Sequence, residues 1–491
     1  MVRRLNLPGT GDTGRTRHPA VVVAVLATTG ICMSLMQTLV IPLIPELPTL
    51  LNTNASNASW AITATLLVAA VATPVFGRLG DMYGPKPMLI ACAVVMTAGS
   101  LIAASTSAWI PVVIGRALQG FGVPIVPLGI SVLRTCVPPH RVGTAMGLMS
   151  ASFGVGGALG LPLAAIIADH FDWHAVFWFA AILGAVSGVV FAVLVPRIPS
   201  ASADRLDPLG TLGLAAGLVT LLLGISKGGS WGWTSANTLG MFVASIAIFA
   251  MFAWWQLRTE SPIVDLRTTV RRPVLMTNVA SVAVGFAMFA LALIGPQILE
   301  LPVTTGYGLG LSMLHAGLWL APGGLAMMVS SPIASRVAAS RGPRFTLCLG
   351  CAIVAASYLA GLVLLGSAWQ LCLMNILISV GVGFAYSSLP ALINAAVPMS
   401  ETAAANGINA LARALGTSIS SAIIGAVLTG LTISVAGQEF PSLTAFRMAL
   451  VIAAGMAALA AVLAVMIPVA DADEDAAPVT VPDAAISRSG S

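Results

Sequence analysis

Fourteen apolar segments, each about as long as a membrane-crossing helix, follow one another along the 491 residues. A helix needs about 20 mostly apolar residues to cross the hydrocarbon core of a bilayer. Charged residues make up only 8% of the chain, against about 25% in a soluble domain. The sequence therefore predicts an all-α polytopic membrane protein. The segments lie near residues 19–47, 58–77, 87–105, 109–133, 143–168, 173–195, 208–226, 237–256, 274–299, 312–337, 345–366, 369–395, 402–430 and 446–468.

Basic residues are distributed unevenly between the two sets of connecting loops. If the N-terminus lies in the cytoplasm, the cytoplasmic side holds 18 of the 22 Lys and Arg, and the outer loops hold only Lys227 and Arg447. Lys and Arg accumulate in the cytoplasmic loops of membrane proteins. We therefore predict a multi-pass protein of the cell membrane with both termini in the cytoplasm. The Ala-, Gly- and Val-rich composition favours a bacterial source.

The sequence repeats itself at an offset near 260 residues. GRLGDMYGPKPMLI at 77–90 resembles SRVAASRGPRFTLC at 335–348, and TAMGLMSASFG at 144–154 resembles AANGINALARALG at 404–416. The offset corresponds to eight segments, which predicts two pseudo-symmetric six-helix bundles with two helices inserted between them. The predicted divisions are a cytoplasmic tail at 1–18, an N-terminal bundle at 19–196, the inserted pair at 208–256, a C-terminal bundle at 274–468 and a disordered cytoplasmic tail at 469–491.

Three motifs carry a resemblance to a known family. They are GRLGDMYGPKP at 77–87, VVIGRALQGFG at 112–122 and AGLWLAPGG at 316–324. They resemble the loop between helices 2 and 3, helix 4 and helix 10 of the major facilitator superfamily, specifically its fourteen-helix drug:proton antiporter branch. The resemblance covers nearly the whole chain. It implies a secondary active transporter that works by alternating access and couples the efflux of an amphipathic drug or metabolite to protons.

The first of these motifs is a polar, turn-rich cluster between two apolar segments. The resemblance implies that Asp81 latches the cytoplasmic side by pairing with basic groups and with a helix N-terminus of the other half. A carboxylate at a helix N-terminus is favoured by about 0.3–1 kcal/mol, which suits a contact that must also release. The alternative is an ordinary positively charged turn. The candidate gating residues are Gly77, Arg78, Asp81, Gly84, Lys86, Arg134 and Arg141.

Arg116 and Gln119 lie in the middle of the fourth apolar segment. An arginine at that depth costs about 2.5–3.5 kcal/mol on insertion scales and usually serves a function. Arg116 lies seven residues after Trp109, which corresponds to about 10 Å of helix. We predict that Arg116 faces the central cavity and binds a carboxylate, a carbonyl or the substrate. The alternative is an arginine whose side chain extends to the membrane surface.

Asn406, Asn409 and Arg413 form a polar stripe, because the spacings i, i+3 and i+7 place them on one helical face. Such a stripe faces either the substrate cavity or a neighbouring helix. Both interpretations fit the sequence. Gln37, in the first apolar segment, is a further candidate for the substrate cavity.

One departure from the family pattern bears on proton coupling. Aligning Pro45 with the proline of helix 1 puts Met36 where the antiporter branch carries an acid. The remaining candidates for a proton-carrying group are Glu300, then Glu46, and His315, because burial raises the pKa of a carboxyl group and His titrates near neutral pH. The alternative is that these residues are ordinary charges in the outer loops.

Other classes of function have little support in the sequence. We see no nucleophile–base pair, metal-ligand cluster or ATP-binding motif in it, so we predict no enzymatic activity, no cofactor and no metal. The alternatives to an exporter are an uncoupled or differently coupled uptake carrier, and a membrane receptor or lipid-handling protein that transports nothing. The predicted partners are a small-molecule substrate, protons and the lipid bilayer, without nucleic acid, and the predicted oligomeric state is a monomer.

Overall fold

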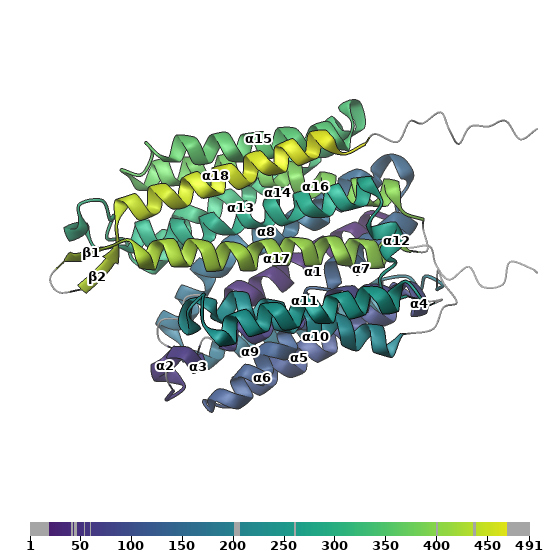
Figure 1. Ribbon diagram of the computed structural model, residues 1–491, viewed down its shortest axis with the longest axis horizontal. Helices are drawn as coiled ribbons and strands as arrows, with labels where there is room; N and C mark the ends of the chain where they lie inside the picture. The colour runs from purple at the N-terminus through teal and green to yellow at the C-terminus, as the bar shows by residue number, and fades with distance from the viewer. Residues whose placement is uncertain are drawn as a thin grey trace, which may run out of the picture.

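The computed structural model describes residues 19–40, 43, 47–53, 55–58, 60–200, 207–259, 262–398, 401–435 and 438–468. Over these ranges the chain is almost entirely helical, with one short antiparallel strand pair (Figure 1). Within the described ranges, fourteen helical spans are long and apolar enough to cross a membrane, which confirms the predicted fold class. The predicted tails at 1–18 and 469–491 lie outside the described residues.

The described elements fall into a first group, an inserted pair and a second group along the chain. The first group is α1 (Pro19–Thr38), α2 (Leu47–Leu50), α3 (Ala55–Ala58), α4 (Trp60–Tyr83), α5 (Pro85–Ala104), α6 (Trp109–Gln119), η2 (Gly120–Gly122), α7 (Ile125–Cys136), α8 (Pro139–His170) and α9 (His174–Leu194). The inserted pair is α10 (Pro208–Trp231) and α11 (Ala236–Gln256), followed by the short α12 (Leu266–Thr269). The second group is α13 (Arg272–Glu300), η3 (Val303–Thr305), α14 (Met313–Arg341), α15 (Pro343–Gly361), α16 (Ala368–Ala396), α17 (Thr402–Gly430), β1 (Thr432–Val435), β2 (Gln438–Pro441) and α18 (Leu443–Met466).

The fourth span, predicted as one helix over 109–133, is broken in the structure. It consists of α6 and α7, joined by the 3-10 turn η2. Gly120 lies so close to α4 that a Cβ there would be 2.6 Å from the carbonyl oxygen of Thr65. Pro124, which has no N–H to donate, precedes α7. The break therefore combines a close helix contact with a missing backbone donor.

The two copies of the sequence repeat share the same corner. Gly84 and Gly342 have φ values of +87° and +86°, which glycine adopts without the strain that a side chain would bring. Each glycine is followed by a proline at the first position of the next helix, where its fixed φ is favourable. This shared geometry supports the internal repeat.

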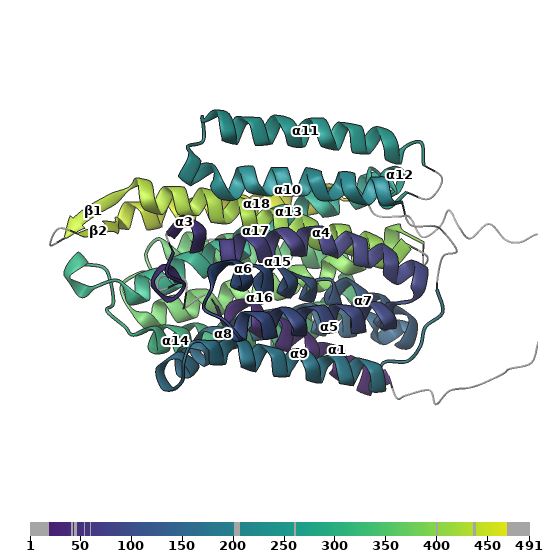
Figure 2. The same ribbon diagram turned by 90° about the horizontal axis from the view of Figure 1, so that it is seen from below.

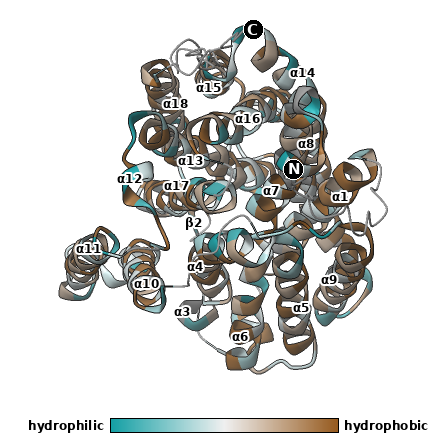
Figure 3. Cartoon of the chain, turned by 90° about the vertical axis from the view of Figure 1, so that its right-hand side faces the viewer, coloured by the Kyte–Doolittle hydropathy of each residue, from teal (hydrophilic) through white to brown (hydrophobic). Residues whose placement is uncertain are grey.

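The inserted helices lie along one side of the other spans. Figures 2 and 3 show α10 next to the main group and α11 outside it. Figures 1 and 2 show that α1 begins and α18 ends at the same end of the molecule. We call this end, which also carries the α4–α5 corner and α12, the α12 end, and the opposite end the β1–β2 end. The domain boundaries and the side on which the termini lie remain predictions.

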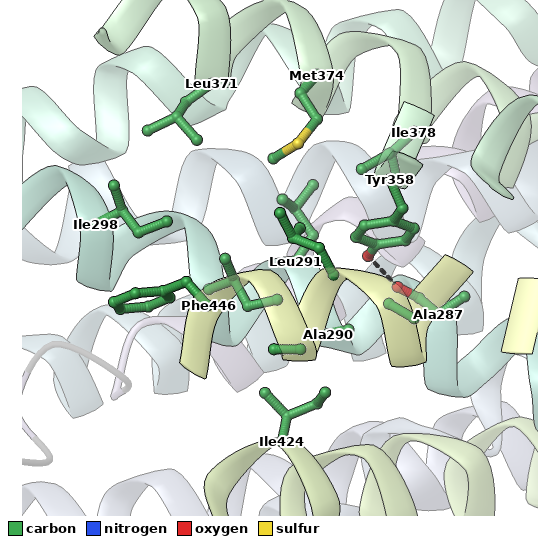
Figure 4. Close-up of a cluster of buried hydrophobic side chains, with 14 of the residues drawn as sticks. Ala287, Ala290, Leu291, Ile298, Tyr358, Leu371, Met374, Ile378, Ile424 and Phe446 are labelled. Atoms are coloured by element: carbon green, nitrogen blue, oxygen red, sulfur yellow. Dashed lines mark hydrogen bonds between the residues drawn. The ribbon is translucent and has the colours of Figure 1, made fainter. Parts of the chain in front are cut away.

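Each group of six spans has its own apolar core. In the second group, the hydroxyl of Tyr358 on α15 donates a hydrogen bond to the carbonyl oxygen of Ala287 on α13, within a cluster that includes Ile378, Ile424 and Phe446 (Figure 4). A second cluster joins α1, α5, α7, α8 and α9 of the first group. Because lipid chains are as apolar as the core, close packing rather than the hydrophobic effect holds such helices together.

Candidate functional site

Asp81 lies near the end of α4 and joins the two groups of helices. Its carboxylate accepts hydrogen bonds from the backbone N–H groups of Ala403 and Ala404, at 3.2 and 2.9 Å. Both residues belong to the first turn of α17, where the N–H groups have no partner within the helix and the helix dipole is positive. Asp81 is only 2% exposed. The carboxylate therefore binds a helix N-terminus of the other group, although its gating role remains a prediction.

Arg134, at the end of α7, reaches the same place from the first group. Its Nη1 donates a hydrogen bond to the hydroxyl of Thr402, the first residue of α17. Its Nη2 donates to the carbonyl oxygen of Asn394 on α16, at 3.0 Å. Together with Asp81, Arg134 thus connects the first group to the start of α17. We call the contacts of Asp81 and Arg134 with residues 394 and 402–404 the latch.

The latch depends on a close approach of the two backbones. A Cβ added at Gly77 would lie 2.8 Å from the carbonyl oxygen of Ala403, closer than real Cβ contacts. Further along the same pair of helices, a Cβ at Gly407 of α17 would lie 3.1 Å from the carbonyl oxygen of Thr73. Small residues allow this kind of approach in membrane helices. At position 77 the glycine of the family motif is therefore needed because a larger side chain would clash with α17.

Charged groups surround the latch unevenly. Arg78 attracts the Asp81 carboxylate and Glu401 repels it. Arg78, Glu401 and Asp265 also line a cavity of about 170 Å³ between α4, α13, α17 and the α12 segment. Of the basic gating candidates, Arg78 thus acts on Asp81, whereas Arg134 binds α16 and α17.

The remaining gating candidates lie around the α12 end. Arg141 is exposed at the start of α8, and Lys86 is half-buried at the start of α5. Gly84 forms the corner between α4 and α5, and a Cβ there would lie 2.7 Å from the carbonyl oxygen of Ile198. These residues shape the corner next to the latch.

Arg116 and Gln119 form a chain of hydrogen bonds within the first group of helices. The Arg116 Nε donates to the carbonyl oxygen of Ala61 at 3.0 Å, and its Nη1 donates to the Gln119 side-chain oxygen at 2.6 Å. The Gln119 amide then donates to the hydroxyl of Ser100 at 2.8 Å. Arg116 is 3% exposed, so it does not extend to the membrane surface. A carbonyl is one of the predicted partners, and a contact with substrate remains a prediction.

The stripe on α17 is bonded to neighbouring helices. The Asn409 amide donates to the Asn278 side-chain oxygen at 3.0 Å and to the Ser281 hydroxyl at 2.7 Å, both on α13. The Asn406 amide donates to the Asn394 side-chain oxygen on α16 at 2.6 Å.

Arg413 completes the stripe. Its guanidinium donates to the Asn409 side-chain oxygen and lies 5.1 Å from the ring centre of Tyr386. These contacts favour the second of the two interpretations, in which the stripe holds helices together.

The candidates for proton coupling lie at the β1–β2 end. Glu300 is exposed at the end of α13, and His315 is exposed in the first turn of α14, where it binds the hydroxyl of Ser312. Glu46 and the side chain of Gln37 lie outside the described residues. Met36 is buried in an apolar cluster of the first group. At this position an apolar side chain that packs against its neighbours thus replaces the acid of the antiporter branch.

The sequence interpretation did not identify Thr402, Asn394 or Ser335 as residues that join the groups. Ser335 on α14 donates a hydrogen bond to the carbonyl oxygen of Gly143 on α8, at 3.1 Å. Asn394 was visible as an amide in an apolar segment, which is a signal for interhelical bonding. Thr402 and Ser335 gave no comparable signal, because single hydroxyl groups are common in membrane helices.

Comparison with protein families and curated sequences gives consistent matches. The Major Facilitator Superfamily matches over residues 26–421. The uncharacterized MFS-type transporter YhcA of Bacillus subtilis is 27% identical over 337 residues, a match that covers 68% of this chain and 62% of YhcA. A multidrug resistance protein B homolog of Mycobacterium tuberculosis is 27% identical over 384 residues, covering 76% of this chain and 69% of that protein. The chain thus spans less than two thirds of YhcA.

Comparison with solved structures gives the same fold. The human organic anion transporter MFSD10 (TETRAN) superposes with a TM-score of 0.65, covering 91% of this chain and 99% of MFSD10. The sequence identity is 16%, so this likeness concerns the fold alone.

Proposed function

The chain belongs to the Major Facilitator Superfamily, and from this premise we propose that it exports an amphipathic drug or metabolite in exchange for protons. Members of the family are transporters, so the chain is a multi-pass membrane transporter that binds small molecules. The name of one relative, multidrug resistance protein B homolog, supports a drug or metabolite as the substrate. The further steps of the proposal rest on the latch.

The observation that carries the proposal is the pair of hydrogen bonds from the start of α17 to Asp81. Alternating access requires the two groups of helices to separate at one end while they close at the other. In the proposed cycle the latch holds the α12 end closed while substrate leaves at the β1–β2 end. Hydrogen bonds to a charged group contribute about 1.5–3 kcal/mol each, an amount that ligand binding can overcome.

Proton coupling is proposed to act through the same carboxylate. Glu300 is exposed at the end of α13, whereas Asp81 is buried between the groups. A protonated carboxyl group accepts weaker hydrogen bonds and no longer interacts as an anion with the helix dipole. Protonation of Asp81 would therefore open the latch. This assignment would replace the acid that is missing at Met36.

The proposal is tested by transport into inside-out membrane vesicles. We expect a panel of fluorescent amphipathic compounds, including a lipophilic cation, to contain at least one that accumulates when the vesicles are energised. A protonophore should abolish that accumulation. Accumulation that is indifferent to the protonophore would contradict proton coupling and favour the alternative, an uncoupled or differently coupled carrier. Vesicles that lack the protein provide the control.

A further inference from the structure

A second cavity lies near the β1–β2 end, between α4, α10 and α17. Its volume is about 390 Å³, within the range of about 300–1,000 Å³ that small-molecule sites occupy. α4 and α17 touch at Gly77 and at Gly407, but further from the α12 end their residues 63–67 and 418–429 line this open space. Both groups of helices and the inserted pair contribute to its wall. The cavity is therefore placed where a relative movement of the groups would change it.

Two glycines face this space with nothing in front of them. A Cβ added at Gly425 on α17 or at Gly229 on α10 would meet no atom within 4 Å, and both residues line the cavity. Other glycines on the same helices are packed: a Cβ at Gly416 would lie 2.0 Å from the carbonyl oxygen of Val282. Gly425 and Gly229 thus leave room where a larger side chain would fill the cavity.

Hydroxyl side chains line the cavity together with Trp233, whose indole N–H is a hydrogen-bond donor. Ser418 and Thr429 donate hydrogen bonds to carbonyl oxygens of their own helix, at 3.0 and 2.9 Å. Thr63 and Ser226 bond to each other across α4 and α10, at 3.0 Å. A hydroxyl group has one donor and two acceptor sites, so Ser418 and Thr429 retain acceptor capacity. The wall therefore suits a ligand that brings hydrogen-bond donors.

Among the described residues that line this cavity, none carries a charged side chain. The other lining groups are aliphatic side chains of α4, α10 and α17, the two glycines and the ring of Trp233. A charged ligand group would be costly in a space that lacks a countercharge. The lining therefore favours an apolar body without a net charge.

We propose that this cavity binds a neutral amphipathic small molecule that carries one or two hydrogen-bond donors. Its apolar body would fill the space in front of Gly425 and Gly229, and its donor groups would bind the hydroxyl oxygens of α17. That this molecule is the transported substrate rests on the proposed function. The binding site itself does not.

Photolabelling of the purified full chain in lipid nanodiscs tests the site without any transport. The probe is a benzyl alcohol that carries a trifluoromethyl diazirine, which is neutral and has one hydroxyl group. Adducts are mapped by mass spectrometry of peptides. We expect saturable labelling of the residues that line the cavity, whereas labelling of Ile423, which is 40% exposed on α17, should rise in proportion to the probe.

Filling the cavity should remove this labelling. Gly425→Leu places a side chain in the open space, and leucine favours a helix more than glycine does, so the helix should be retained. We expect labelling of the cavity to fall about tenfold or more, since the apolar contacts of a ring are lost. Gly455→Leu on α18 is the matched control, because a Cβ there also meets nothing within 4 Å and Gly455 is exposed. It should label as the unmodified chain does.

Two outcomes would overturn the site. In the first, labelling in the cavity does not saturate and equals that of Ile423, so that the space is a groove for lipid chains. In the second, Gly425→Leu labels as strongly as Gly455→Leu. Neither result bears on the proposed function, which the vesicle assay tests separately. Conversely, saturable labelling in a chain that transports none of the panel would support the site and contradict the proposed function.

Discussion

The carboxylate of Asp81 accepts a 2.9 Å hydrogen bond from the backbone N–H of Ala404, which lies 323 residues further along the chain. This contact joins the end of α4 to the first turn of α17, and Arg134 reinforces it through Thr402. Because α4 and α17 belong to different groups of six spans, the contact can exist only while the α12 end is closed. The mechanical account of the transporter depends on it.

Asp81→Asn should weaken the latch and leave the substrate site intact. The amide keeps one oxygen acceptor but loses the negative charge that interacts with the start of α17. We expect the preference for the closed α12 end to fall by about 2 kcal/mol. This is about 30-fold in the equilibrium between the closed and the open α12 end. Energised accumulation in vesicles should fall to background while equilibrium binding of the same compound is retained. The control is Asp172→Asn, because Asp172 is exposed in the loop before α9; reduced accumulation in that variant would contradict the specific role of Asp81.

Gly77→Ala should hinder closure even though Asp81 remains. The added Cβ would lie 2.8 Å from the carbonyl oxygen of Ala403, so the two helices must move apart. We expect lower transport with normal insertion into the membrane, measured by vesicle uptake and by the amount of protein in the membrane fraction. Gly143→Ala is the matched control at the same end of the molecule, since a Cβ there meets nothing within 4 Å. Equal transport by the two variants would argue against a close approach at Gly77.

Arg134→Lys should be an incomplete replacement. Two nitrogens of the guanidinium bind two different groups, Thr402 and Asn394, whereas an ammonium group is a single point charge. We expect vesicle transport by Arg134→Lys to lie between that of the unmodified chain and that of Arg134→Gln. If the lysine variant transports normally, charge alone explains the residue and the two-point contact is unnecessary.

Asn409→Ala should destabilise the second group of helices. The substitution removes the partner of Asn278, Ser281 and Arg413, and a buried polar group left without a partner costs about 1–3 kcal/mol. Thermal unfolding of the purified protein in detergent measures this loss. Ser418→Ala is the control, since the Ser418 hydroxyl bonds within its own helix. If the variant is fully stable yet no longer binds substrate, the result would favour the other interpretation, in which Asn409 lines the substrate cavity.

Much of the fold could be predicted because the bilayer imposes a length and a composition on every span. The repeated corner could be recognised from its Gly-Pro pair. Gly84 and Gly342 each precede a proline, and both adopt the positive φ that glycine allows. The break between α6 and α7 was not predicted, since it depends on how closely Gly120 approaches α4. That approach is a property of the packed pair of helices.

The sequence predicted only one of the two partners in the candidate site. The family motif singled out Asp81, but its partners are backbone N–H groups of Ala403 and Ala404, which any residue at those positions would supply. The cavity near Gly425 was invisible for a related reason. The sequence does not distinguish a glycine that packs against a carbonyl oxygen, as Gly416 does, from one that faces open space.

The distance across the α12 end measures the latch most directly. Spin labels at Tyr83→Cys on α4 and Ala339→Cys on α14, both exposed positions, can be placed in a chain whose six native cysteines are replaced by alanine. The account predicts one dominant short distance in the chain that retains Asp81, and a shift of population to longer distances in Asp81→Asn. Identical distance distributions in the two proteins would contradict it.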